Sequence, residues 1–113
     1  MATNPDHVLQ QLMRVIEDRK VHPPKRSYTT ALFAGGLEKI GAKILEEARE
    51  VVEAAAESGP ERHQHVVYEV ADLFYHVLVL LGYQDIQFTE VEQELSRRFG
   101  VSGLDEKEAR GEK

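Results

Sequence analysis

Residues 37–57 read LEKIGAKILEEAREVVEAAAE, and residues 61–81 read ERHQHVVYEVADLFYHVLVLL. In the first stretch apolar residues recur every three or four positions, which is the pattern of a long amphipathic helix. The second stretch is apolar almost all round in its second half, as expected for a helix that is buried on several sides. A Ser-Gly-Pro sequence separates the two stretches in the order typical of a helix end. The sequence therefore predicts two long helices that pack as an antiparallel pair.

Shorter helices are predicted on both sides of this pair. Residues 7–20 carry apolar side chains at helical spacing, and a Pro-Pro pair ends that helix. Residues 25–30 form a basic, hydroxyl-rich loop that leads into a short turn of helix before a Gly-Gly pair. Thr89 followed by Glu92 has the capping-box pattern, which predicts the start of a final helix that runs to about residue 99. No segment shows strand-like alternation, so we expect an all-α fold of four to five helices.

The length of 113 residues favours a single domain that spans residues 1–113. We expect residues 6–99 to be ordered and residues 100–113, which are rich in glycine and charge, to form a flexible tail. A chain of this size buries only about two-thirds of its unfolded surface, so a monomer would have a thin core. The core is therefore expected to be completed by dimerisation.

Composition and charge exclude several classes of protein. The 14 basic residues against 20 acidic ones give a net charge of −6, which argues against a nucleic-acid binder. The absence of cysteine rules out a disulfide scaffold, a thiolate zinc site and a cysteine nucleophile. The N-terminal residues lack the pattern of a signal peptide, and the longest charge-free apolar stretch, residues 73–83, is shorter than the roughly 18 residues of a membrane span. We therefore expect a cytoplasmic protein without nucleic-acid or membrane partners.

Each of the two long helices carries a pair of acids three residues apart, Glu47 with Glu50 and Glu69 with Asp72. At about 100° per residue, one acid of each pair lies at the edge of the apolar stripe and the other lies just outside it. In an antiparallel pair these four carboxylates converge and repel one another, and a hard divalent cation relieves that repulsion. Ligation by oxygen alone favours Mg²⁺ or Mn²⁺. The alternative is that these acids form an ordinary solvated helix face, which is what either acid pair indicates when it occurs alone.

Two further side chains flank the acids. Lys43 lies between the two acids of its helix and is predicted to contact a phosphate, with an ion pair to Glu47 as the alternative. His76, four residues after Asp72, is predicted to contact substrate or support the site, with a core histidine whose ring nitrogens are hydrogen-bonded as the alternative.

The loop before the first long helix offers positive charge and hydroxyl groups suited to phosphate. The residues concerned are Lys25, Arg26, Ser27, Tyr28 and Thr29. An ordinary polar connection is the alternative. His63 and His65, near the start of the second long helix, are expected to be solvated.

The acid motifs, Glu-Glu-x-x-Glu at residues 46–50 and Glu-x-x-Asp at residues 69–72, resemble the signature of the all-α nucleotide pyrophosphohydrolase (MazG-like) superfamily. Within it, the Ser-Tyr-Thr at residues 27–29 and the Tyr-His after Ala-Asp-Leu are most similar to the phosphoribosyl-ATP pyrophosphohydrolase family of histidine biosynthesis. The resemblance covers about residues 8–99. Leu45 departs from the family pattern, in which many members have glycine before the paired glutamates, and this bears on packing only.

The resemblance implies a MazG-like helical bundle that forms a homodimer or higher homo-oligomer. It also implies a nucleotide-binding enzyme that uses Mg²⁺ to hydrolyse phosphoribosyl-ATP to phosphoribosyl-AMP and pyrophosphate. The metal ligands carried over from the family are Glu47, Glu50, Glu69 and Asp72. Glu46 is the candidate to orient or deprotonate the attacking water, although its helix angle points away from the other four acids. The alternatives are a house-cleaning pyrophosphohydrolase of free nucleoside triphosphates and a non-catalytic helical dimerisation module.

Overall fold

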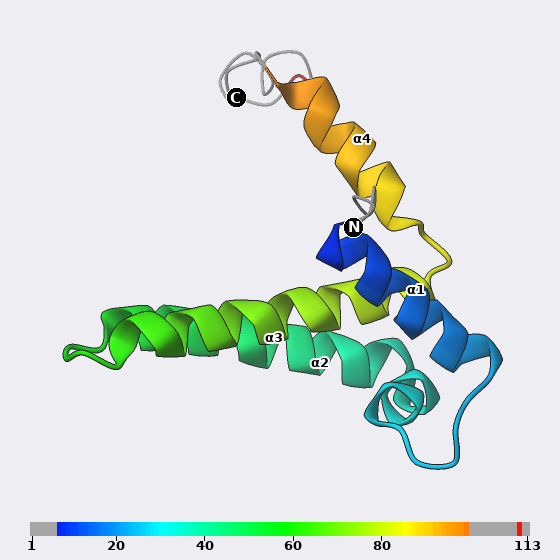
Figure 1. Ribbon diagram of the computed structural model, residues 1–113, viewed down its shortest axis with the longest axis horizontal. Helices are drawn as coiled ribbons and strands as arrows, with labels where there is room; N and C mark the ends of the chain where they lie inside the picture. Colours follow the sequence, from blue (N-terminus) through cyan, green and yellow to red (C-terminus); the bar gives the residue numbers. More distant parts are fainter. Residues whose placement is uncertain (1–6, 100–110, 112–113) are drawn as a thin grey trace, which may run out of the picture.

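The computed structural model describes residues 7–99 and residue 111. These residues form four helices and no strand, which confirms the predicted all-α fold (Figure 1). The helices are α1 (Val8–Val21), α2 (Tyr28–Ala56), α3 (Arg62–Tyr83) and α4 (Phe88–Arg98). Apart from residue 111, the predicted tail at residues 100–113 lies outside the described residues.

Helices α2 and α3 form the predicted antiparallel pair, joined by a short loop at residues 57–61 (Figure 1). Helix α2 begins earlier than the first long stretch because it includes the short turn of helix before the Gly-Gly pair. A kink at Gly36, where φ is 71° and ψ is −168°, separates that turn from the long segment. Glycine adopts this backbone conformation readily because it has no Cβ. The first turn is capped by Ser27, whose Oγ accepts a hydrogen bond from the backbone N–H of Thr30 at 3.2 Å.

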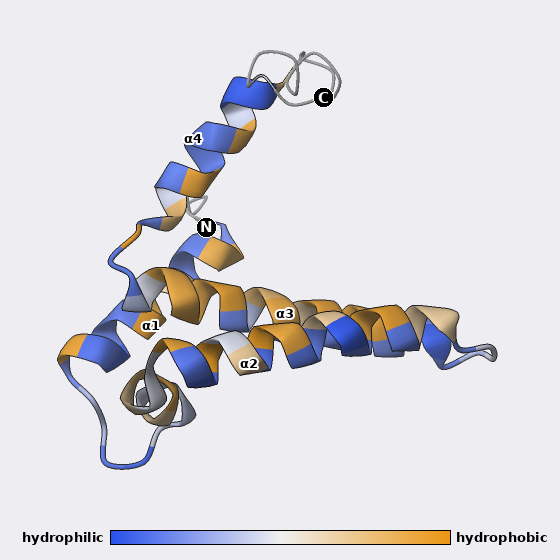
Figure 2. Ribbon diagram, turned by 180° about the vertical axis from the view of Figure 1, so that it is seen from behind, coloured by the Kyte–Doolittle hydropathy of each residue, from blue (hydrophilic) through white to orange (hydrophobic). Residues whose placement is uncertain are grey.

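The buried core lies where α1 packs across one end of the α2–α3 pair. Each of these three helices contributes two large buried side chains to it. They are Met13, Ile16, Leu32, Ile40, Leu78 and Val79. The rest of the α2–α3 pair projects beyond α1, and Figure 2 shows hydrophobic residues continuing along its length.

The start of α4 differs from the sequence prediction. Its capping box uses Gln87 and Glu90, two residues before the predicted Thr89 and Glu92, and the Gln87 backbone N–H donates to Glu90 Oε2 at 2.9 Å. Glu92 instead faces α1, where its Oε2 lies 2.7 Å from Nε2 of His7. The capping prediction was wrong because a contact with a distant helix engages this glutamate.

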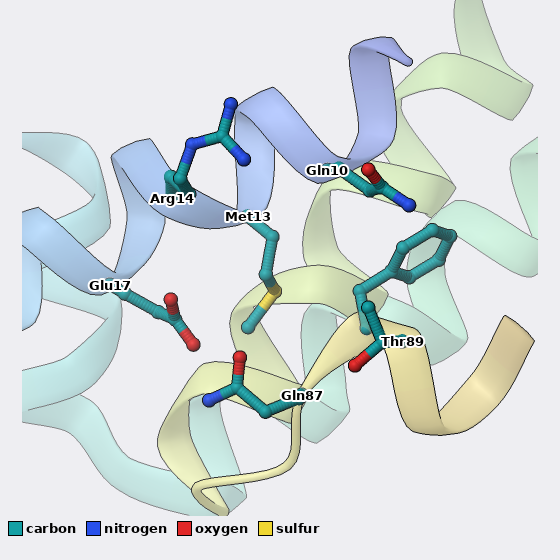
Figure 3. A pocket seen from close by; sticks show the side chains of 7 residues that line it. Gln10, Met13, Arg14, Glu17, Gln87 and Thr89 are labelled. Atoms are coloured by element: carbon teal, nitrogen blue, oxygen red, sulfur yellow. The ribbon is translucent and has the colours of Figure 1, made fainter. Parts of the chain in front are cut away.

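A pocket of about 290 Å³ lies between α1 and the start of α4 (Figure 3). It is lined by Gln10, Met13, Arg14, Glu17, Gln87, Phe88 and Thr89. None of these residues belongs to the acid motifs of α2 and α3, so this pocket is separate from the predicted metal site.

Helix α3 is the one helix among the described residues that is long and apolar enough to cross a membrane. This is weak evidence for a membrane segment, because the core helix of a soluble protein has the same length and composition. Only 28% of its most apolar 18-residue window is buried within a single chain. One chain therefore leaves much of the apolar surface of α3 uncovered.

Candidate active site

Acidic side chains from α2 and α3 meet in the middle of the helix pair. One carboxylate oxygen each from Glu47, Glu69 and Asp72 lies within 4.8 Å of the other two. A second group on α2, formed by Glu46, Glu47 and Glu50, satisfies the same distance. Glu47 belongs to both groups and is therefore the centre of a five-carboxylate cluster.

The two acids expected at the edge of the apolar stripe are the most buried of the cluster. Glu47 is 4% exposed and Glu69 is 9% exposed, whereas Glu50 and Asp72 are half-buried. This order agrees with the angles that the sequence predicts at about 100° per residue.

Glu47 is in an unfavourable state as a bare carboxylate. Burial, followed by repulsion from Asp72 and Glu50, raises its pKa to about 7. Its Oε2 is buried and has no hydrogen-bond partner among the described residues. A buried acceptor without a partner is costly, and a bound cation would satisfy it. The donor set, which consists of carboxylate oxygens alone, fits Mg²⁺ or Mn²⁺.

Glu46 and Lys43 lie on the more exposed side of the cluster. Although its helix angle points away, Glu46 reaches Glu50 because residues four apart are neighbours on a helix surface. The Lys43 ammonium pairs with Glu46 Oε2 at 3.3 Å, and the alternative of a pair with Glu47 is wrong because Glu47 turns into the helix interface. Burial lowers the pKa of Lys43, but the hydrogen bond to Glu46 and the nearby Tyr28 raise it above its ordinary value.

A chain of hydrogen bonds joins the start of α2 to α3 beside Asp72. His76 is 3% exposed, and its Nδ1 lies 2.8 Å from the backbone oxygen of Asp72. Because a carbonyl oxygen only accepts, Nδ1 carries the hydrogen, and in the neutral ring Nε2 accepts from the Tyr28 hydroxyl at 2.9 Å. The histidine ring is therefore hydrogen-bonded on both sides within the protein, and it ties Tyr28 to the acid cluster.

The loop residues are placed differently from one another. Tyr28 is half-exposed, and burial raises the pKa of its hydroxyl while Lys43 lowers it, so the hydroxyl lies within the electrostatic reach of the cluster. Ser27 caps α2, and buried Thr29 is hydrogen-bonded through its Oγ1 to the hydroxyl of Tyr75. Lys25 and Arg26 are exposed on the loop.

His65 is a residue whose role the sequence reasoning missed. It was expected to be solvated, but its Nε2 lies 3.1 Å from Glu69 Oε2 and its Nδ1 lies 2.9 Å from Glu57 Oε1. The hydrogen bond to Glu57, and then that to Glu69, raise the pKa of His65. The spacing of four residues between His65 and Glu69 is the sequence signal that could have indicated this contact.

Comparisons with known proteins agree with the resemblance. The sequence matches the family described as phosphoribosyl-ATP pyrophosphohydrolase over residues 9–99. A protein of Geotalea daltonii named phosphoribosyl-ATP pyrophosphatase is 52% identical over 105 residues, which cover 93% of this chain and 96% of the relative. A protein of Geobacter metallireducens with the same name is 50% identical, and the match covers 93% of this chain and 94% of the relative. A third protein of this name, from Rhodopirellula baltica, is 48% identical, and the match covers 90% of this chain and 85% of the relative. The chain therefore belongs to the phosphoribosyl-ATP pyrophosphohydrolase family.

Proposed function

We propose that this chain hydrolyses phosphoribosyl-ATP to phosphoribosyl-AMP and pyrophosphate, a step of histidine biosynthesis. Family membership and the name shared by its relatives support this substrate. The observation that carries the proposal is the meeting of Glu47, Glu69 and Asp72, together with a buried oxygen of Glu47 that has no hydrogen-bond partner within the described part of the chain. The cytoplasm is the proposed location, because it holds the phosphorylated nucleotides of biosynthesis.

The proposed metal is Mg²⁺, with Mn²⁺ as an alternative. Its ligands would be Glu47, Glu50, Glu69 and Asp72, which combine two buried and two half-buried carboxylates. When bound, such a cation neutralises charge on the leaving pyrophosphate and lowers the pKa of a bound water. The outer acids, Glu50 and Asp72, are partly exposed, so a triphosphate would approach the metal from the solvent side.

The remaining side chains would hold the substrate and the water. Glu46 lies beside the proposed ligands and carries a carboxylate that can orient the attacking water and accept its proton. Lys43 is charged and partly exposed next to it, so its ammonium can bind a phosphate oxygen. Tyr28, whose hydroxyl donates to His76, lies within electrostatic reach of Lys43 and would offer its hydroxyl oxygen to the substrate as an acceptor. The exposed Lys25 and Arg26 would add positive charge at the entrance.

Pyrophosphate release from phosphoribosyl-ATP, measured with Mg²⁺ and with a chelator, tests the proposal. Wild type should release pyrophosphate and phosphoribosyl-AMP in equal amounts, and only when Mg²⁺ is present. Glu50→Gln should lower the rate at least about tenfold, because even residues that only support metal ligands have effects of this size. Glu53→Gln is the matched control: Glu53 is exposed on the same helix and pairs with Arg49, so the rate should stay near that of wild type.

Other substrates distinguish the alternatives. A preference for canonical or damaged deoxynucleoside triphosphates over phosphoribosyl-ATP would make the chain a house-cleaning pyrophosphohydrolase. No hydrolysis of any nucleotide, together with no effect of Mg²⁺ on thermal melting, would favour a non-catalytic dimerisation module.

We also propose that the chain forms a homodimer through an apolar groove of about 330 Å³ between α1, α3 and α4. The groove is lined by Leu9, Leu73, Phe74, Val77, Leu78, Leu81, Phe88, Val91 and Leu95. Exposed apolar side chains also occur along the projecting α2–α3 pair, among them Leu45, Val52 and Val67. A second copy presents the same apolar side chains, so two copies could cover them in a self-complementary interface.

Sedimentation equilibrium tests the dimer. Wild type should sediment as a dimer, and Phe74→Glu, which places a charge in the groove, should sediment as a monomer. Val21→Glu is the control, because Val21 is exposed at the end of α1 and does not line the groove. A wild-type monomer at all concentrations, or a dimer that survives Phe74→Glu, would overturn the assignment of this face.

A further inference from the structure

His65 lies between an acid of the candidate metal site and the end of the neighbouring helix. Its Nε2 is 3.1 Å from Oε2 of Glu69 on α3, and its Nδ1 is 2.9 Å from Oε1 of Glu57, the residue that follows the last turn of α2. The imidazole ring is therefore held on both of its nitrogens. It connects the α2–α3 loop to the acid cluster.

The contact restrains a carboxylate that belongs to the cluster. The Glu69 side chain is 11% exposed, and one of its oxygens lies within 4.8 Å of oxygens of Glu47 and Asp72. A glutamate side chain has three rotatable bonds, and its terminal torsion is broad. A hydrogen bond to one oxygen fixes this torsion and so fixes the direction of the other oxygen.

We propose that His65, held by Glu57, is a positioning residue that orients the carboxylate of Glu69 to bind a divalent cation together with Glu47 and Asp72. The inference rests on the proposed function, because it takes Glu69 as a metal ligand. Hydrogen bonds to ligating side chains commonly contribute a factor of 10 to 100 in metal affinity. Among the described residues, Glu69 is the one acid of the cluster whose carboxylate is hydrogen-bonded to an imidazole side chain.

Charge and positioning predict opposite effects of removing the ring. A protonated imidazole near the cluster repels a cation, so on charge alone His65→Ala should tighten metal binding. On positioning, the same change should weaken it, because Glu69 becomes free to rotate. The sign of the change in Mg²⁺ affinity therefore separates the two effects.

Mg²⁺ binding to the full chain, measured by titration calorimetry without substrate, tests the inference. We expect His65→Ala to raise the dissociation constant about tenfold and Glu57→Ala to raise it less, because the latter leaves the His65–Glu69 contact in place. His65→Gln should recover most of the affinity, because its side-chain amide can donate to Glu69 from one turn away. His63→Ala is the matched control, since His63 is an exposed histidine on the same helical turn.

Thermal melting of the metal-free variants shows that they are folded, and a positioning role predicts melting temperatures close to wild type. Unchanged or tighter Mg²⁺ binding by folded His65→Ala, or an equal loss in His63→Ala, would overturn the inference. Wild type that binds no Mg²⁺ would overturn it too. If wild type binds Mg²⁺ with the expected variant pattern but does not hydrolyse phosphoribosyl-ATP, the substrate proposal fails while the positioning role stands.

Discussion

Replacing Glu47 with glutamine should stabilise the metal-free protein at alkaline pH. Burial beside Asp72 and Glu50 raises the pKa of Glu47 from 4.5 to about 7. Each pKa unit corresponds to about 1.4 kcal/mol, so the ionised carboxylate lowers the free energy of unfolding by about 3 kcal/mol. Glutamine has nearly the same shape, carries no charge and can donate hydrogen bonds to the neighbouring acids.

The pH dependence has a definite sign. The pKa of Glu47 is higher in the folded than in the unfolded state, so the folded state holds the proton over the interval from about 4.5 to about 7. The free energy of unfolding of wild type therefore falls as pH rises through this interval and stays low above it. The stability advantage of Glu47→Gln over wild type should be smallest near pH 4 and reach about 3 kcal/mol near pH 8.

Urea unfolding with a chelator, at one fixed protein concentration and several pH values, measures this difference. Saturating Mg²⁺ should nearly remove the difference near pH 8: at a concentration one hundred times the dissociation constant it stabilises wild type by about 2.7 kcal/mol, which almost offsets the advantage of about 3 kcal/mol, and it leaves the glutamine variant unchanged. Glu53→Gln, at an exposed position on the same helix, should show neither effect. If metal-free Glu47→Gln is no more stable than wild type near pH 8, the reasoning about this buried carboxylate is refuted.

Three further substitutions test the packing around the site. Ile40→Ala removes a fully buried side chain and should lower the free energy of unfolding by 2–5 kcal/mol in urea titrations; a loss below about 1 kcal/mol would contradict the placement of Ile40 in the core. Gly36→Ala places a Cβ at a φ of 71° and 3.3 Å from the Tyr83 hydroxyl, so it should cost about 1–3 kcal/mol by the same measurement, and an unchanged midpoint would argue against the kink. Tyr28→Phe removes the hydrogen bond to His76 and should lower the free energy of unfolding by about 1 kcal/mol. The same substitution in a His76→Phe background should have a smaller effect, and an equal loss in both backgrounds would show that the two side chains do not interact.

The helix pair and its acids could be predicted because they depend on local periodicity. Apolar spacing defined the two long helices, and a rotation of about 100° per residue placed Glu47 and Glu69 inward of Glu50 and Asp72. The structure buries the first two acids and half-buries the other two. A fixed rotation per residue is enough to give this order, so no knowledge of distant contacts was needed.

Contacts between elements could not be predicted in the same way. Glu92 was assigned to the cap of its own helix, yet it contacts His7, the N-cap residue of α1, which is distant in sequence. Tyr28 meets His76 because α2 and α3 pack together, and no spacing rule relates these two positions. The contact of His65 with Glu57 crosses the turn between the helices, and its geometry depends on how the loop closes.

The acid cluster of the candidate active site lies within one helical hairpin, in the stretch from residue 46 to residue 72. Contacts between residues that are close along the chain form quickly during folding, because little loop entropy is lost when they meet. The loop at residues 57–61 is short, so α2 and α3 need only a brief search to pair. The acidic centre can therefore assemble in an early, fast phase of folding, before α1 and α4 dock against each other through Glu92.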